Sequence, residues 1–138
     1  MITTEERQRL GRRNKSCAFT YEMKCIQELK KEGYSWAHRS YASKGSHGFD
    51  VIAANQENVL FIQVKSTKRN IVHIQSIENH FKKDIDVLRD IPINPTVQCL
   101  LWVWTAKQGK AGEQGYRKAG WRKFRVIEKG LIEYERDR

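Results

Sequence analysis

Three side chains able to do chemistry lie in one apolar stretch, residues 48–66. Asp50 begins a short apolar run, and Gln63 and Lys65 interrupt the end of a second one. The polar turn between the runs, residues 55–58, is typical of a β-hairpin. Because side chains alternate along a strand, Gln63 and Lys65 project to the same side. The opposite side carries residues that can only be core: Leu60, Ile62 and Val64. Burying an acid, an amide and an ammonium group without partners is costly, and a divalent metal with a phosphate ligand would supply partners.

A helix predicted from Ser16 to Glu32 packs on this sheet. Ser16 is a suitable N-cap, and Gly33 is a suitable stop signal. The apolar face of the helix comprises Phe19, Ile26 and Leu29, with Met23 beside them. At about 100° per residue, Glu22 falls inside this apolar face, whereas Glu28 and Glu32 fall outside it as surface charges. Glu22 therefore either serves a site on the sheet or pairs with a Lys or Arg at the edge of the face.

A polar loop leads directly to Asp50. A strand over residues 34–39 is predicted at the edge of the sheet, followed by a loop over residues 40–48 that is rich in Ser and Gly. Hydroxyl and backbone N–H groups in such loops bind phosphates, and Ser43 is a candidate. The same composition also suits a loop without a ligand. His47 is more typical of a loop residue than of a metal ligand.

The remaining pattern completes an α/β sandwich. A second amphipathic helix is predicted from the spacing of Ile74, Ile77, Phe81, Ile85 and Leu88. Strands are predicted over residues 96–105 and 121–127, joined by a mobile basic loop over residues 107–120. The tail, residues 128–138, is expected to form a short helix or to fray. We therefore expect a single domain, residues 1–138, with a mixed β-sheet and a helix on each side.

The charge balance limits the class of partner. Lys and Arg outnumber Asp and Glu by 26 to 16, a formal net charge of +10 on 138 residues. This favours nucleic acid or an anionic membrane over a small neutral substrate, with a merely solvated basic surface as the alternative. The most basic segment, residues 1–15, is expected to be a short helix or a flexible arm, either solvated or gripping phosphates.

Two further features indicate where the protein works. No apolar run approaches the roughly 20 residues that a membrane-spanning helix needs. The three cysteines fit no zinc-binding spacing. We therefore expect a cytoplasmic protein, bound to no membrane, whose thiols are reduced and mostly buried.

The acidic, amide and lysine positions resemble the core of the PD-(D/E)XK nucleases, and more closely the archaeal-type Holliday-junction resolvases. The resemblance runs in order through Tyr21-Glu22, Leu29, residues 31–34, Arg39 to Ser43, Asp50 to Ala53 and Ile62 to Thr67, with a looser match beyond. It implies a restriction-endonuclease-like fold. It further implies that Glu22 is a helix-borne carboxylate, Asp50 the main metal ligand and Lys65 the catalytic lysine. Ser43 would lie near the scissile phosphate.

One position departs from the family pattern. Gln63 stands where these proteins usually carry Glu. Its amide oxygen can still ligate Mg²⁺, because hard cations accept carbonyl oxygens, although with one negative charge fewer. Glu22 would compensate directly or through water. We expect Asp50, Gln63 and Glu22 to bind Mg²⁺, with Mn²⁺ able to substitute.

The resemblance implies a structure-selective DNA endonuclease that resolves four-way junctions by paired phosphodiester cleavage in recombination and repair. Two matched cuts imply a homodimer. Binding is expected through phosphates, because no element for reading bases is present. The expected DNA-binding residues are Arg12, Arg13, Lys15, Arg39, Lys44, Lys68, Arg69 and Lys110.

Three alternatives remain open at this point. The same fold could cut flaps, nicked DNA or linear duplex. Gln63 could have disabled the site, leaving a catalytically inactive DNA-binding protein. Charge and aromatic content alone would also suit a structural RNA-binding protein.

Overall fold

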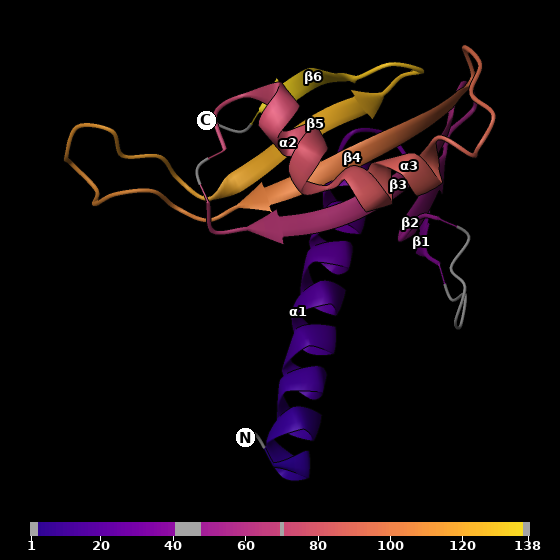
Figure 1. Cartoon of the computed structure of the whole chain (residues 1–138). Helices are drawn as coiled ribbons and strands as arrows, with labels where there is room; N and C mark the ends of the chain where they lie inside the picture. The colour runs from indigo at the N-terminus through magenta and orange to yellow at the C-terminus, as the bar shows by residue number, and fades with distance from the viewer. Residues whose placement is uncertain (1–2, 41–47, 70, 137–138) are drawn as a thin grey trace.

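The computed structural model describes residues 3–40, 48–69 and 71–136. These residues form a mixed β-sheet with helices on both sides, which confirms the predicted fold class (Figure 1). The elements in chain order are α1 (Thr4–Lys31), β1 (Trp36–Arg39), β2 (Val51–Ala54), β3 (Val59–Thr67), α2 (Ile74–His80), α3 (Lys82–Leu88), β4 (Val97–Thr105), β5 (Gly120–Val126) and β6 (Leu131–Arg136).

The six strands lie in the sheet in the order in which they occur in the chain, so β1 is an edge strand as predicted. All neighbouring strands are antiparallel except β3 and β4, which are parallel. A parallel pair needs a crossover connection, and α2 and α3 provide it. The parallel register pairs Lys65 with Val103 and Thr67 with Thr105, so β3 and β4 end together at one end of the sheet.

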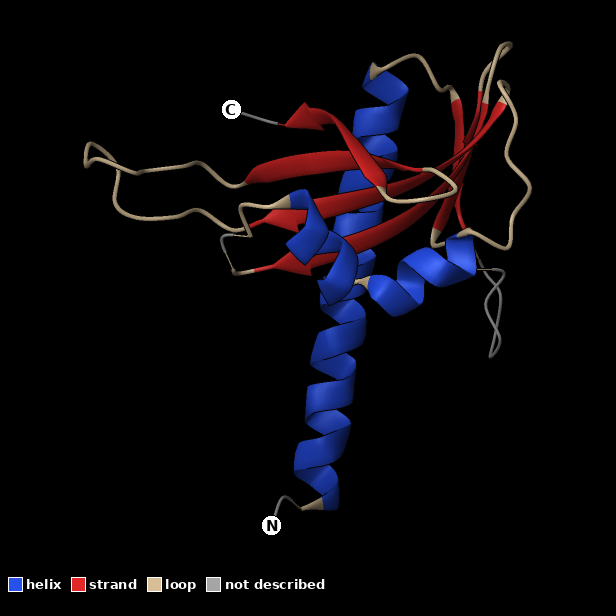
Figure 2. Ribbon diagram, turned by 45° about the horizontal axis from the view of Figure 1, so that its top comes forward, coloured by secondary structure: helices blue, strands red, loops and turns tan. Residues whose placement is uncertain are grey.

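The two faces of the sheet carry separate cores. The C-terminal half of α1 covers one face, and α2 and α3 cover the other (Figure 2). Leu60, Ile62 and Val64 are buried in the α1 core, as the strand alternation predicted. The opposite core joins Ile77, Ile85 and Leu88 of the short helices to Leu101, Val103 and Phe124 of the sheet.

Helix α1 begins much earlier than predicted. Thr3 is its N-cap: its side chain accepts from the Glu6 N–H at 3.1 Å, and the Glu6 carboxylate accepts from the Thr3 N–H at 3.0 Å. This capping box outcompetes Ser16, which lies inside the helix. Residues 4–15, predicted as a separate arm, form the first half of the helix, which extends beyond the sheet (Figures 1 and 2). Phe19 is 48% exposed, so the prediction that it packs on the sheet was wrong.

Two other predicted elements also differ. The second amphipathic helix is interrupted at Phe81, which separates α2 from α3 while its own side chain stays buried. Residues 131–136 of the tail, which was predicted to be helical or frayed, form β6, antiparallel to β5. Two features stabilise β6: Leu131 is buried in the core, and Glu133 and Glu135 form ion pairs with Arg122 and Lys123 on the neighbouring strand.

The described cysteines agree with the sequence prediction. Cys25 and Cys99 are buried free thiols. Burial raises the pKa of Cys99 to about 11, so this side chain stays a thiol at neutral pH. Within the described part of the chain, no helix combines the length and the apolar character needed to cross a membrane.

Candidate active site

Asp50 occupies the fork where β2 separates from β3. Its backbone N–H donates to Ile62 O at 2.8 Å, and its Oδ2 accepts from the Val64 N–H at 2.9 Å. The pairing of β2 with β3 ends at Val51 opposite Ile62, so β2 offers the Val64 N–H no backbone partner. Since a buried N–H needs an acceptor, the Asp50 carboxylate takes that place and is held in the fork.

Gln63 is only 6% exposed, and its Nε2 donates to Gly48 O at 2.8 Å. Gly48 has φ +86°, and a Cβ at this position would lie 2.6 Å from Val87 Cγ1 of α3. Glycine is therefore required both by the backbone conformation and by the close approach of α3. A carbonyl oxygen can only accept, so the nitrogen end of the Gln63 amide faces Gly48 and Oε1 is the end left for a ligand.

Lys65 projects toward α3, on the same side of β3 as Gln63. Its Nζ lies 3.0 Å from Asp84 Oδ1, and the two side chains are 31% and 33% exposed. Asp84 lies on α3, so the ion pair orients the Lys65 ammonium group from that helix. Because both partners reach solvent, its contribution to stability is small, at most about 1 kcal/mol. The effect of the ion pair is instead to fix the position of the Lys65 side chain.

Glu22 approaches the same end of the sheet from α1. Its Oε1 lies 3.4 Å from Arg39 Nε at the end of β1, and the Glu22 side chain is only 12% exposed. Glu22 thus pairs with an arginine, which confirms the second expectation for this residue, whereas its service in a site on the sheet stays a prediction. The Arg39 guanidinium also lies over the Phe19 ring, 4.6 Å from its centroid.

The ionisable groups at this end of the sheet act on one another. Burial raises the pKa of Asp50, and the nearby Asp84 charge adds to the rise, against the hydrogen bond from Val64 and the charge of Lys65. Burial also raises the pKa of Glu22, mainly offset by Arg39. Since a neighbouring cation favours the ionised carboxylate, a bound metal ion would lower both pKa values.

Comparison with solved structures identifies the architecture. Hjc of Archaeoglobus fulgidus, a Holliday junction resolvase from an archaeal hyperthermophile, matches with a TM-score of 0.55 and 18% sequence identity. The match covers 85% of this chain and 87% of that one. The chain has the Hjc fold. No family model and no curated protein matches the sequence.

The donors at the fork of this Hjc-like fold suit a hard divalent cation. Within the described residues, no hydrogen bond engages Asp50 Oδ1 or Gln63 Oε1. One carboxylate and one amide oxygen, completed by substrate phosphate and water, are ligands of the kind Mg²⁺ accepts. The described acidic residues form no ready three-carboxylate cluster here, so metal affinity without DNA is expected to be weak.

The Hjc-like fold brings only some of the predicted site residues together. Asp50, Gln63 and Lys65 converge on the fork, with Glu22 and Arg39 beside it. The exposed cations Lys68, Arg69 and Lys110 lie beyond the end of β3 and in the β4–β5 connection. Three predicted loop residues lie outside the described residues, as do three side chains of α1: Ser43, Lys44 and His47, and Arg12, Arg13 and Lys15.

Sequence reasoning missed Asp84. It lies three residues after Phe81 and four before Leu88, at the edge of the apolar face of the second predicted helix. Glu22, by contrast, falls inside the apolar face of the first helix, so the same rule gives only a weak signal for Asp84.

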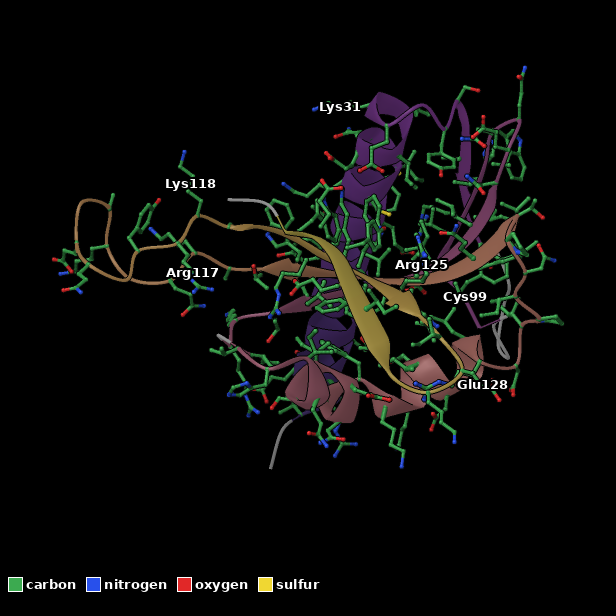
Figure 3. All side chains as sticks on the ribbon, turned by 90° about the horizontal axis from the view of Figure 1, so that it is seen from above. Lys31, Cys99, Arg117, Lys118, Arg125 and Glu128 are labelled. Atoms are coloured by element: carbon green, nitrogen blue, oxygen red, sulfur yellow. The ribbon has the colours of Figure 1, made fainter. Side chains whose placement is uncertain are left out.

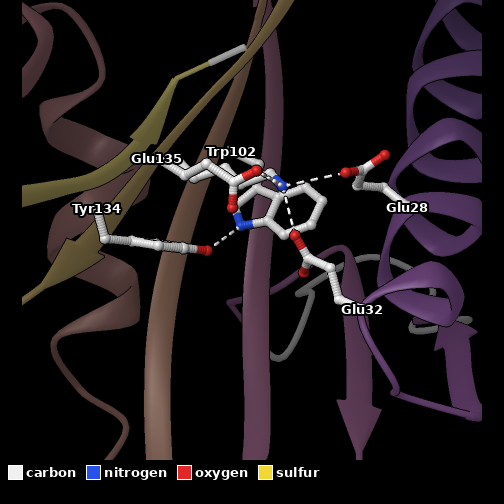
Figure 4. A network of polar contacts seen from close by, with 6 residues as sticks. Glu28, Glu32, Trp102, Tyr134 and Glu135 are labelled. Atoms are coloured by element: carbon white, nitrogen blue, oxygen red, sulfur yellow. Dashed lines mark hydrogen bonds and ion pairs between the residues drawn. The ribbon is translucent and has the colours of Figure 1, made fainter.

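Away from the fork, the fully buried Lys123 forms a second charged cluster with Glu28, Glu32 and Glu135. Figure 4 shows these three carboxylates pointing toward one another. The Lys123 Nζ lies 2.6 Å from Glu32, 3.1 Å from Glu135 and 3.4 Å from Glu28. The carboxylates approach within 4.8 Å of one another, and the Lys123 ammonium offsets part of their charge. Glu28 and Glu32 do reach the surface as predicted, but they are not ordinary surface charges, because both pair with a buried lysine.

Proposed function

We propose that this protein is a metal-dependent DNA endonuclease that resolves four-way junctions by paired cuts. The observation that carries the proposal is the convergence of Asp50, Gln63 and Lys65 at the β2–β3 fork of an Hjc-like fold. The carboxylate and amide oxygens can bind a metal ion, and the ammonium group can stabilise negative charge, which are two ways of promoting phosphodiester hydrolysis.

Each residue has a distinct role. Asp50 and Gln63 would hold Mg²⁺, or Mn²⁺ in its place, with Glu22 acting directly or through water. The bound cation supplies polarisation of the phosphate and a lowered pKa for the attacking water. Lys65 orients that water or stabilises the charge that develops on the phosphate. Arg39 keeps Glu22 in place beside the fork.

Junction resolution needs two cuts, and a symmetric homodimer would place two forks on one junction. Backbone phosphates would be bound by the basic residues predicted from the sequence. The formal charge of +10 supports binding dominated by such contacts. Selectivity would then follow the shape of the branched DNA rather than its sequence.

The test is cleavage of an end-labelled four-way junction with Mg²⁺, next to flap, nicked and linear duplex DNA of the same sequence. Symmetric paired nicks in the junction alone would support a resolvase. Equal cleavage of all substrates would replace it with a general nuclease of this fold. Tight junction binding without cleavage in either Mg²⁺ or Mn²⁺ would refute catalysis.

A non-catalytic junction-binding protein is the second candidate, and one observation favours it. Two polar groups of the fork already have protein partners, since Gln63 Nε2 donates to Gly48 O and Lys65 pairs with Asp84. These contacts would hold both side chains in place in a protein that binds DNA without cutting it. Replacing Gln63 separates the two candidates.

Gln63→Glu is expected to make the fork depend on metal. Without a divalent cation, the new carboxylate faces Gly48 O, the hydrogen bond is lost, and the free energy of unfolding falls by about 1–3 kcal/mol. With Mg²⁺, the carboxylate becomes a ligand, so the Tm should rise more with Mg²⁺ in the variant than in the unmodified protein. Thermal unfolding over a Mg²⁺ titration measures both effects.

Gln56→Glu, in the exposed β2–β3 turn, is the matched control. An Mg²⁺-induced Tm shift no larger in Gln63→Glu than in this control would show that position 63 does not face a metal ion. Cleavage that appears only in Gln63→Glu would establish the second candidate for the natural sequence.

Asp84→Asn tests the placement of Lys65. The amide keeps a hydrogen-bond acceptor for Lys65 but loses the charge that holds the ammonium, so kcat is expected to fall about tenfold, as for other groups that act through a neighbour. Junction affinity should stay equal or increase, because an acid near DNA is removed. Single-turnover cleavage and equilibrium binding measure the two quantities separately.

Asp84→Glu should restore part of the rate, and Asp86→Asn, on the exposed side of the same helix, should have no effect. A change in affinity with an unchanged kcat in Asp84→Asn would contradict the positioning role.

A further inference from the structure

The connection between β4 and β5, residues 106–119, projects from one end of the sheet (Figures 1 and 3). We call this segment the β4–β5 arm. Its residues 109–115 and 117–119 are exposed, so it buries little apolar surface. Ordering such a segment costs conformational entropy without a compensating core contribution. Its ordered form therefore suits binding rather than stability of the fold.

The two sides of the arm are paired at one isolated β-bridge near its base. Gln108 and Arg117 exchange two backbone hydrogen bonds of 2.9 Å each, which pairs the two sides of the arm. The tip is closed by hydrogen bonds from the Glu113 N–H to Lys110 O and from the Tyr116 N–H to Glu113 O, at 3.0 and 3.3 Å. The mobility predicted for this segment stays a prediction.

The base of the arm is joined to the end of β3. The Ala106 N–H donates to Thr67 O at 3.1 Å, and Gln108 Nε2 donates to Lys68 O at 3.0 Å. Thr67 and Lys68 come two and three residues after Lys65, so the arm starts directly beyond the strand that carries this lysine. DNA positioned against Lys65 would therefore continue along the arm.

The arm is strongly basic. It carries one acidic residue, Glu113, and four basic ones, Lys107, Lys110, Arg117 and Lys118, a net formal charge of +3. Arg117 and Lys118 lie on the side of the arm that returns to β5 (Figure 3). The major groove of DNA accommodates a two-stranded β-ribbon and is lined on both sides by phosphates. The paired base of the arm and its positive charge suit such a groove.

We propose that the β4–β5 arm enters the major groove of the duplex that flanks the scissile phosphate, with its four cations on the bordering phosphates. This inference rests on the proposed function, because it takes branched DNA as the ligand. In this arrangement the arm holds the duplex against the β2–β3 fork. Binding would weaken as salt rises, and the slope of log K against log salt would be proportional to the number of phosphates contacted.

The first experiment changes the four basic residues of the arm to Gln in a catalytically silent Asp50→Asn background. Binding to a fluorescent four-way junction is measured by anisotropy between 50 and 200 mM NaCl, values chosen as about the range over which such contacts are lost. The slope of log K against log salt should fall in magnitude by about 3 to 4. The matched control changes four exposed cations elsewhere: Lys30, Lys31, Arg125 and Lys129. The slope of log K against log salt should stay largely unchanged in this control.

The second experiment tests the groove. Residues 109–116 are replaced by Asn-Gly, a two-residue turn that closes the hydrogen-bonded pair Gln108–Arg117 without strain. Dimethyl sulfate methylates guanine N7 in the major groove, so guanines covered by the arm should be protected by the full-length chain and exposed with the shortened one. Circular dichroism and the Tm verify that the shortened chain is folded.

The outcomes separate the two proposals. The full-length chain could cleave the junction while the shortened variant shows the same guanine protection and the same salt dependence of binding. This result would overturn the arm inference and leave the proposed function intact. A full-length chain that binds no junction at all would overturn both. Loss of protection and slope only in the arm variants is the expected result.

Discussion

Asp50→Asn is expected to abolish junction cleavage while preserving the fold. The asparagine Oδ1 can still accept the hydrogen bond from the Val64 N–H, so the fork should stay closed. The amide lacks the negative charge that holds a divalent cation, and the rate should fall by about 10³-fold, the upper range for a single electrostatic group. Single-turnover cleavage at saturating protein measures the loss.

Asp90→Asn, an exposed aspartate beyond α3, is the control and should cleave at the unmodified rate. Junction affinity of Asp50→Asn measured without metal should stay equal or increase, because the substitution removes a negative charge beside the DNA. Retention of more than about a tenth of the rate would show that Asp50 is not the main ligand, because that is a smaller loss than one electrostatic group produces. The proposed role of Asp50 in binding the metal ion would then be wrong.

Lys123→Met is expected to destabilise the protein more than any other single change discussed. The substitution keeps the volume beside Trp102, whose ring centroid lies 4.3 Å from Nζ, but leaves three carboxylates facing one another. Removing one partner of a buried ion pair costs about 3–5 kcal/mol. We expect about 3 kcal/mol and a Tm lower by about 10 °C, because the carboxylates reach solvent and can be partly rehydrated.

The effect should also depend on pH. Burial lowers the pKa of Lys123, but hydrogen bonds to Glu32 and Glu135 outweigh this, so its pKa lies above the ordinary value of 10.5. A folded-state pKa above the unfolded one means that the stabilisation is complete below pH 10.5 and is lost as the pH rises through the folded-state pKa. The difference in stability between Lys123→Met and the unmodified chain should therefore shrink in strong alkali, and also in acid, where Glu32, whose pKa is raised mainly by burial, and the other two carboxylates become protonated.

Urea unfolding at pH 7 measures this difference, with Lys129→Met at an exposed position as the control expected to stay within about 0.5 kcal/mol. If Lys123→Met proved as stable as the parent, the apolar side chain would compensate fully for the lost ion pairs. The cluster would then contribute specificity rather than stability.

Local sequence pattern was sufficient for the central hairpin and for the faces of its side chains. The period of two along β3 placed Gln63 and Lys65 opposite Leu60, Ile62 and Val64, because alternation is a property of the extended backbone itself. Turn composition placed the connection from β2 to β3. Pattern alone also singled out Asp50 and Glu22, and the resemblance added their roles; both lie at the same end of the sheet.

Contacts between elements distant in sequence could not be predicted in the same way. Lys123 is buried because Glu32 and Glu28, 91 and 95 residues away, come from α1, while Glu135 comes from β6. A charge-rich tail alone indicates a frayed end. It becomes a strand only when its acids meet the cations of β5, and that pairing exists only in the folded sheet.

The same holds for the surroundings of the fork. Asp84 and Gly48 are ordinary helix and loop residues until the crossover between β3 and β4 brings α3 against the hairpin. Periodicity describes which side of an element is apolar, whereas the partner of a polar group on that side depends on which element packs there. The chemistry-bearing residues of β3 were therefore predictable, and the groups that orient them were decided by the tertiary structure.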